Sequence, residues 1–442
     1  MTRTILLGLW VLLATANLAD AQKNREEKVR DDRKKVEQEG FWIYNDLAAG
    51  FAEAHKTGKP LLVVLRCIPC EECVKLDDDL VDRDPRVRPL LEKFVCVRVV
   101  STNGLDLSLF QYDYDQSFAA FLLNADGTIY GRFGTRSHRT SWADDVSIDG
   151  LAQALRGALV LHAEYPKNRG ALAGKHGPKP EFSTPETYPT LRGKYGPKLD
   201  YAGKVVPSCI HCHQIGEAQR QVYLARRQPL PEKLLFPYPH PKAIGLILDP
   251  KEKASVRRIE EGTPAARAGF REGDKIVSLE GQPLLSLADV QWVLHNAAEE
   301  ASLTAQVQRD GKPVSLTLTL PKGWRRRDTI SWRVSSWALR RMVAGGMVLE
   351  ELTNEARKKA GLSEAEMALH VRYLGQSGPH AAAKQAGFQQ GDILVSFDGK
   401  SDLTRETDLL AYTVNAHKPG EKVAVIVRRG DERIELMLPM QE

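Results

Sequence analysis

Long apolar runs are nearly absent from this sequence of 442 residues, and the exception, residues 5–13, is too short to span a bilayer. A multi-pass membrane protein is therefore excluded. Glycine (34) and proline (24) occur at ordinary levels, which excludes collagen-like and low-complexity classes. The excess of positive charge is only +5, too dilute to indicate a nucleic-acid partner. At roughly 150 residues per domain, the length suggests about three domains.

The short apolar run has the features of a secretory signal. Arg3 precedes it, and an Ala-Asp-Ala sequence that ends at Ala21 follows it. This order predicts a signal peptide over residues 1–21, cleaved before Gln22, with an uncleaved anchor as the alternative. The mature protein is expected to be periplasmic or extracellular, without a stable membrane span, where thiols can oxidise.

Apolar patterning then divides the chain. Residues 22–40 are highly charged and show no apolar face, so we expect a solvated lead-in. The next region, 41–165, predicts an α/β domain with mixed strand directions. Its expected helices are 46–55 and 149–165, and its expected strands are 61–65, 94–100, 118–123 and 128–133.

The C-terminal part has a different pattern. Residues 166–240 begin with a proline-rich stretch, which predicts an extended linker. Two β-rich units, 241–322 and 345–442, flank a connector at 323–344 that contains tryptophan and a helix. The fold class expected for the whole chain is multidomain α/β plus mainly β.

The two β-rich units are an internal repeat. An Ala-Gly-Phe sequence, followed two residues later by Gly-Asp, occurs at Gly269 and again at Gly387. Both glycines are expected to end a helix with positive φ, and the aspartate is expected to hold the following turn. The repeat resembles the PDZ domains of periplasmic Deg-type proteases. The serine protease domain that precedes PDZ modules in those proteins has no counterpart here, so protease activity is not expected.

A PDZ domain binds the C-terminus of a protein or peptide by adding a strand to one of its sheet edges. The resemblance therefore implies two peptide-binding grooves. Their expected residues are Ile244, Gly245 and Leu246 in the first domain, and Gly346, Met347 and Val348 in the second.

Three of the six cysteines, Cys67, Cys70 and Cys73, directly follow the expected strand 61–65. Thiols at the start of a helix favour the reactive thiolate. The arrangement resembles thioredoxin-like proteins, which implies Cys70 as the attacking thiol and Cys73 as the resolving thiol. A pair Cys67/Cys70, a structural disulfide and a zinc site are the alternatives. The proline that thioredoxins place before the strand facing their thiols is missing from residues 116–120.

A second group, Cys209, Cys212 and His213, has the Cys-x-x-Cys-His spacing of a c-type haem attachment site. We expect two thioether bonds, with His213 as the ligand of the haem iron and His240 as a candidate for the opposite position. A zinc site and a plain disulfide are the alternatives for this group.

Taken together, these parts resemble the bacterial family of thioredoxin-like/PDZ domain-containing (seleno)proteins. The resemblance implies an exported thiol–disulfide redox protein with tandem PDZ domains, a covalent haem c and an unknown redox partner. The alternative is a haem-bearing PDZ scaffold that is not an enzyme and whose thioredoxin fold is structural.

Overall fold

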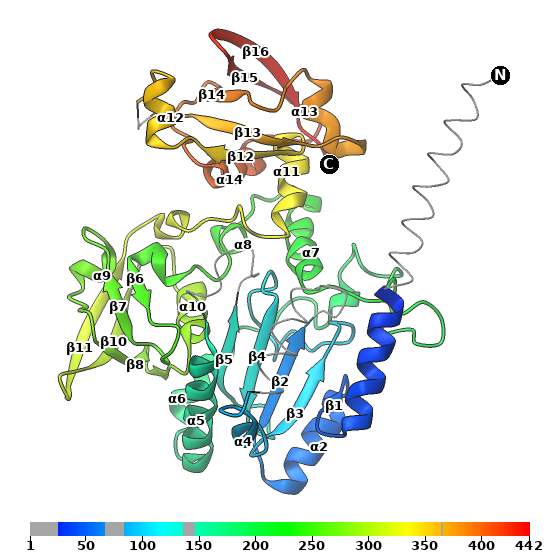
Figure 1. The fold of residues 1–442 in the computed structure, drawn as a ribbon, viewed down its shortest axis with the longest axis vertical. Helices are drawn as coiled ribbons and strands as arrows, with labels where there is room; N and C mark the ends of the chain where they lie inside the picture. Colours follow the sequence, from blue (N-terminus) through cyan, green and yellow to red (C-terminus); the bar gives the residue numbers. More distant parts are fainter. Residues whose placement is uncertain (1–24, 67–83, 136–145, 364–365) are drawn as a thin grey trace. The chain divides into compact units, whose positions relative to one another are not determined.

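A computed structural model describes residues 25–66, 84–135, 146–363 and 366–442 (Figure 1). The chain divides into two compact units. The first unit comprises Met1–Ala218 and Tyr238–Trp324, and the second comprises Gln219–Pro237 and Arg325–Glu442. The α/β domain and the first β-rich domain therefore share one unit.

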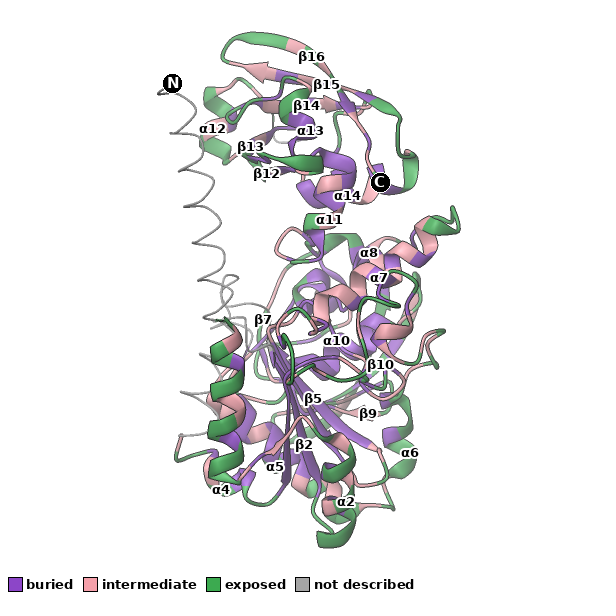
Figure 2. Cartoon of the chain, turned by 90° about the vertical axis from the view of Figure 1, so that its right-hand side faces the viewer, coloured by how far each residue is buried: buried purple, intermediate pink, exposed green. Residues whose placement is uncertain are grey.

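The α/β domain is built on a five-stranded mixed sheet of order β1-β3-β2-β4-β5. Its strands are β1 (Ile43–Tyr44), β2 (Leu61–Arg66), β3 (Val95–Val99), β4 (Phe118–Leu123) and β5 (Ile129–Thr135). β3 runs parallel to β1 and β2, whereas β4 is antiparallel to both β2 and β5. Every residue of β2, β3 and β4 is buried, which explains why their sequences are apolar apart from Arg66 and Arg98 (Figure 2). The predicted mixed sheet is confirmed.

Helices α2 (Leu47–Thr57), α4 (Arg88–Leu91) and α5 (Ile148–Glu164) complete this domain. The Asp46 side chain caps α2 by accepting from the N–H of Ala49, at 2.9 Å. Ser147 caps α5 in the same way through Gly150. The buried residues of α5, among them Leu151, Ala154, Leu155 and Ala158, follow the helical period and join the core under the sheet.

The charged lead-in is not merely solvated. Residues 25–39 form a helix, and within it Val29 and Val36 are almost completely buried. These valines are seven residues apart, so two helical turns bring both to the same face. Two apolar residues were too few to reveal that face in the sequence.

The proline-rich segment is packed rather than extended. It contains α6 (Arg169–Leu172) and two 3-10 turns, η4 (Ala173–Lys175) and η5 (Pro185–Thr187). Leu172 joins the core of the α/β domain, and Tyr188 is buried as well. The prolines make the segment irregular, but neighbouring elements supply the packing that it lacks alone.

The first β-rich domain has strands in two sheets, ordered β11-β10-β8-β9 and β6-β7. The strands are β6 (Leu246–Leu248), β7 (Val256–Ile259), β8 (Lys275–Leu279), β9 (Gln282–Pro283), β10 (Ala301–Arg309) and β11 (Lys312–Leu320). The helical elements are η6 (Pro241–Ile244), α9 (Pro264–Arg267) and α10 (Leu287–Asn296). Nine of the ten residues of α10 are buried, so all sides of this helix are covered.

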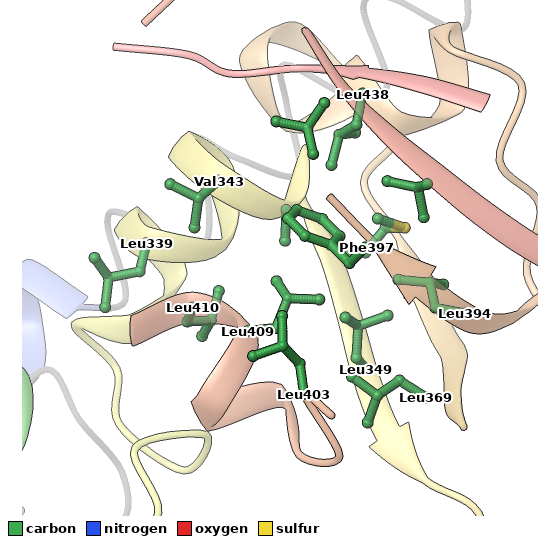
Figure 3. Close-up of a cluster of buried hydrophobic side chains, with 14 of the residues drawn as sticks. Leu339, Val343, Leu349, Leu369, Leu394, Phe397, Leu403, Leu409, Leu410 and Leu438 are labelled. Atoms are coloured by element: carbon green, nitrogen blue, oxygen red, sulfur yellow. The ribbon is translucent and has the colours of Figure 1, made fainter. Parts of the chain in front are cut away.

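The second β-rich domain has a five-stranded sheet of order β12-β13-β14-β15-β16. Its strands are β12 (Met347–Glu351), β13 (Leu369–Leu374), β14 (Ile393–Phe397), β15 (Lys422–Arg429) and β16 (Glu432–Pro439). Two helical elements, α7 (Cys212–Ala225) and η7 (Trp324–Arg327), begin in the first unit and end in the second. The other helical elements of the second unit are α8 (Glu232–Leu235), α11 (Ser336–Ala344), α12 (Asn354–Lys359), η8 (Gly378–Ala381), α13 (Ala382–Gln385) and α14 (Glu406–Ala416). In Figure 3, Leu339 and Val343 of α11 lie with Leu409 and Leu410 of α14 in one apolar core.

The repeated turn behaves as predicted in both β-rich domains. Gly269 has φ +82° and Gly387 has φ +94°, so both occupy the left-handed region after a short helix. The aspartates that follow, Asp274 and Asp392, each accept from a backbone N–H three residues earlier, at 2.9 Å. The predicted role of these residues is confirmed.

Candidate functional site

The described part of the thioredoxin-like site ends at Arg66, the last residue of β2. Cys67, Cys70 and Cys73 lie outside the described residues. The Arg66 side chain is fully buried and donates from Nη2 to Asp32 Oδ1 at 2.6 Å. Asp32 belongs to the helix 25–39, so this helix fixes the end of the strand from which the cysteine cluster departs.

The second cysteine group is attached to the loop that follows β3. Both the backbone N–H and the hydroxyl of Thr102 donate to the carbonyl of Ile210, at 3.1 and 2.8 Å. Asn103 accepts from the N–H of Ile210 at 2.8 Å and donates to the carbonyl of Ser208 at 2.9 Å. Because β2 and β3 are parallel neighbours, their carboxyl ends lie at one edge of the sheet. The Cys209–Cys212 segment therefore lies at the edge where β2 ends.

A small cavity lies at this edge. Residues from the ends of β2 and β3 line it together with Ile210, His211 and Cys212, and Arg66 is one of them. It has room for about one water molecule. Arg66 and Cys212 thus share one small space.

The two sulfurs have different surroundings. Cys209 is 6% exposed, and its pKa is raised to about 12, mainly by burial and further by Cys212, although Ser101 opposes the shift. Cys212 is half-buried, and its Sγ accepts a hydrogen bond from the Tyr112 hydroxyl at 3.1 Å. Burial, and next the neighbouring Cys212, raise the pKa of Tyr112 well above its ordinary value, so this hydroxyl keeps its proton to donate.

Two histidines accompany the cysteines. The rings of His211 and His213 are stacked, with centroids 5.8 Å apart. The pKa of His211 is lowered to about 4, mainly by burial and in part by the neighbouring His213. His213 Nδ1 lies 3.0 Å from Glu217 Oε1, one turn along α7. His240 accepts from the N–H of Lys242 and caps η6.

The haem prediction meets a steric obstacle in this fold. Protein atoms cover Cys209, and the cavity beside Cys212 has room for only about one water molecule. A macrocycle bonded to both sulfurs would have to displace the loop that carries Ser101 and Thr102. The described residues therefore do not fit haem as they are packed, and haem attachment stays a prediction. Within the described ranges, no three His, Cys, Asp or Glu side chains are grouped to hold a metal ion.

The expected groove residues of the first β-rich domain lie at the start of β6, in a two-stranded sheet with β7. Ile244, Gly245 and Leu246 are all buried. Helix α10 contacts β5 of the α/β domain through Asp289, whose Oδ1 accepts from the backbone N–H of Arg132 at 3.2 Å. The same oxygen accepts from the ammonium of Lys175, in η4, at 2.8 Å, with both side chains at most 1% exposed. Burial lowers the pKa of Lys175, and Asp289 opposes that shift.

The same contact includes an aromatic residue of α10. Trp292 donates from Nε1 to the carbonyl of Gly174 at 3.0 Å, and the guanidinium of Arg132 lies 3.8 Å from the Trp292 ring centroid. Arg132 is buried and also donates to the carbonyl of Lys175 at 2.7 Å. No pattern in the sequence indicates this network, because its charged members stand singly in unrelated segments.

The second β-rich domain keeps β12 at the edge of its sheet. Gly346 and Met347 are buried there, and Val348 is half-buried. The next backbone N–H, of Leu349, donates to Glu406 Oε1 of α14 at 2.9 Å. Arg340 of α11 donates to both oxygens of this carboxylate, at 2.9 and 2.6 Å. An intramolecular carboxylate thus occupies one hydrogen-bonding position of the strand edge.

Comparisons with known proteins agree with this architecture. A thioredoxin-like family model matches residues 42–125, and a PDZ domain model matches residues 242–320 and 373–440. This chain joins a thioredoxin-like domain to two PDZ domains. The thioredoxin-like domain includes the five-stranded mixed sheet, and the PDZ domains are the two β-rich repeats.

Curated relatives of this chain include proteases. A DegP-like periplasmic serine endoprotease of Pseudomonas savastanoi is 29% identical over 35% of this chain and 31% of its own length. The periplasmic endoprotease DegQ of Escherichia coli is 26% identical over 43% of this chain and 37% of its own length. A protein of Brucella suis named as a zinc metalloprotease is 40% identical over 18% of this chain and 21% of its own length. The matched part therefore covers well under half of each relative.

Solved structures also overlap parts of the chain. The PDZ domain of HtrA3, bound to a phage-derived peptide, is 19% identical over 21% of this chain and 80% of its own, with a TM-score of 0.17. The HtrA-type protease AlgW with a decapeptide is 13% identical over 31% of this chain and 49% of its own, with a TM-score of 0.19.

Among the helices that the structure describes, none combines the length and the hydropathy needed to span a bilayer.

Proposed function

We propose that this protein is an exported thiol–disulfide redox protein whose PDZ domains recruit protein or peptide C-termini. Cys70 is the attacking thiol and Cys73 the resolving thiol. The observation that carries the proposal is the thioredoxin-like match over residues 42–125, which contains both cysteines directly after a buried central strand. The signal sequence at residues 1–21 and the periplasmic DegP-like relatives support export.

Peptide recruitment is proposed for the second PDZ domain first. β12 is an edge strand, and strand addition to such an edge is how PDZ domains hold peptides. In the first PDZ domain, α10 is covered by the thioredoxin-like domain, which supports a role in joining the two domains.

Reduction of insulin disulfides by the mature protein, with dithiothreitol as the electron source, tests the redox proposal. Turnover is expected for the wild type and is expected to be lost in Cys70→Ser and Cys73→Ser. Cys96→Ser is the matched control, because Cys96 is buried in β3 and donates to the Leu91 carbonyl at 3.4 Å. Absence of turnover in the folded wild type would favour the non-enzymatic PDZ scaffold.

A further inference from the structure

Helix α11 is the segment of the chain that leads into the edge strand of the second PDZ domain. It packs against both β12 and α14. In Figure 3, Leu339 and Val343 of α11 lie with Leu409 and Leu410 of α14, and all four side chains are buried in one core. The strand edge that is proposed to take up a peptide therefore has a helix of the same chain packed against it.

The outward side of β12 is already hydrogen-bonded. Within its sheet, β12 has one neighbouring strand, β13. The N–H of Leu349 donates to Glu406 Oε1 of α14 at 2.9 Å, so it points toward the open edge. Strand addition depends on such outward N–H groups, because they donate to the carbonyl groups of the incoming peptide. The Glu406 side chain is 2% exposed, so a peptide carbonyl reaches this N–H only when the carboxylate leaves.

The glycine loop before β12 is engaged by the same helix. Gly345 and Gly346 have positive φ, and they end α11. Their N–H groups both donate to the carbonyl of Arg340, that of Gly346 at 2.9 Å. Successive backbone N–H groups of this kind are the donors that capture the carboxylate of a peptide C-terminus. In this chain they cap α11 instead.

Arg340 connects the helix to both of these contacts. Its carbonyl accepts from the loop, and its guanidinium donates to both oxygens of Glu406, at 2.9 and 2.6 Å. It also donates to the carbonyl of Ser331 at 2.6 Å, which fixes the position of the side chain. The Arg340 side chain is 4% exposed, so salt and solvent screen these contacts little. A single residue of α11 thus closes the loop and the strand edge together.

We infer that α11 keeps the second PDZ domain closed to peptides, and that a C-terminal peptide binds after α11 shifts and Arg340 releases the loop and Glu406. This inference rests on the proposed peptide recruitment and adds its regulation. A peptide that binds only the open state has an apparent affinity reduced by the fraction of molecules in that state. Weakening the contacts of Arg340 therefore raises the apparent affinity without adding any contact to the peptide.

Peptide selection tests the inference with a variant that lacks these contacts. Arg340→Met together with Glu406→Ala removes both charges and the acceptor of the Leu349 N–H. Random peptides displayed with free C-termini are selected in parallel on the wild-type mature chain and on the variant. A selected peptide, followed by fluorescence anisotropy, is expected to bind the variant about ten-fold tighter than the wild type. Equal affinities would overturn the inference.

The matched control is Asp431→Ala. Asp431 is a fully exposed carboxylate in the turn between β15 and β16, at the other end of the sheet from β12. This variant is expected to bind the selected peptide as the wild type does. The same gain in affinity in Asp431→Ala would overturn the inference, because it would show that any lost carboxylate favours the peptide.

Hydrogen exchange of the wild type with a saturating amount of the selected peptide needs no substitution. Exchange is expected to become slower in β12 and faster in α11, because the peptide adds to the strand and the helix shifts. Slower exchange in β12 with unchanged or slower exchange in α11 would overturn the closed state and leave the proposed recruitment intact. If no selected peptide slows exchange in β12 of either protein, the proposed recruitment by this domain fails, and the inference fails with it.

Discussion

The ion pair between Arg340 and Glu406 allows a quantitative prediction for the second PDZ domain. Both side chains are nearly inaccessible, at 4% and 2% exposure, and Nη2 lies 2.6 Å from Oε2. The Glu406→Gln variant removes the negative charge but keeps an oxygen that can accept from Leu349. The Arg340 guanidinium then stays buried without a countercharge, which costs about 3–5 kcal/mol of unfolding free energy. With a urea slope of about 2 kcal/mol per molar, the midpoint falls by about 2 M.

Hydrogen exchange at increasing urea, read by mass spectrometry on peptides from β12 and α14, measures this loss within the domain. The matched control is Glu350→Gln, because Glu350 pairs with Arg372 at the surface, where the two side chains are 49% and 64% exposed. Solvent screens that pair, so the control is expected to lose less than about 1 kcal/mol.

A double variant isolates the charge effect. Arg340→Met together with Glu406→Gln removes both charges, and it is expected to recover most of the stability lost in Glu406→Gln alone, since a buried pair can be replaced by less polar groups at little cost. Equal losses in Glu406→Gln and Glu350→Gln would refute the reasoning, as would a double variant no more stable than Glu406→Gln.

Two further predictions concern the same domain. A hydrogen bond from the Tyr412 hydroxyl lowers the pKa of Asp398 below its usual 3.8, so the stability that this carboxylate contributes is present above that pH and is lost as the pH falls through the lowered value. In Asp398→Asn, asparagine tolerates the positive φ of 53°, and the urea midpoint is expected to depend less on pH between pH 5 and about 2. An unchanged dependence of the midpoint on pH would contradict this. Gly346→Ala should lower the thermal midpoint more than Gly430→Ala, because both glycines have positive φ but only at Gly346 would a methyl group collide with a backbone carbonyl, that of His380. Equal decreases in circular-dichroism melts would show that this contact is relieved without cost.

The sequence alone determined the features that depend on neighbouring residues. Mainly apolar runs without alternation marked β2, β3 and β4, because strands covered on both faces have no polar side to alternate with. The repeated glycines, Gly269 and Gly387, marked two equivalent turns, because few other residues adopt positive φ without strain. The cysteine spacings and the pattern that predicts a signal peptide could be read for the same reason: each is a short pattern within one segment.

Only the tertiary structure decided what the polar and irregular segments contact. Lys175 stands in a proline-rich stretch that predicted an extended linker, yet it is buried against Asp289, 114 residues away. The Cys209–Cys212 segment is likewise bound to Thr102, across 108 residues. A buried charge or a packed loop is stable only when a partner from elsewhere in the chain satisfies it, and sequence spacing carries no record of that partner. For that reason the motifs indicated the candidate cysteines, while the fold placed the Cys209–Cys212 segment at the edge of the thioredoxin-like sheet where β2 ends.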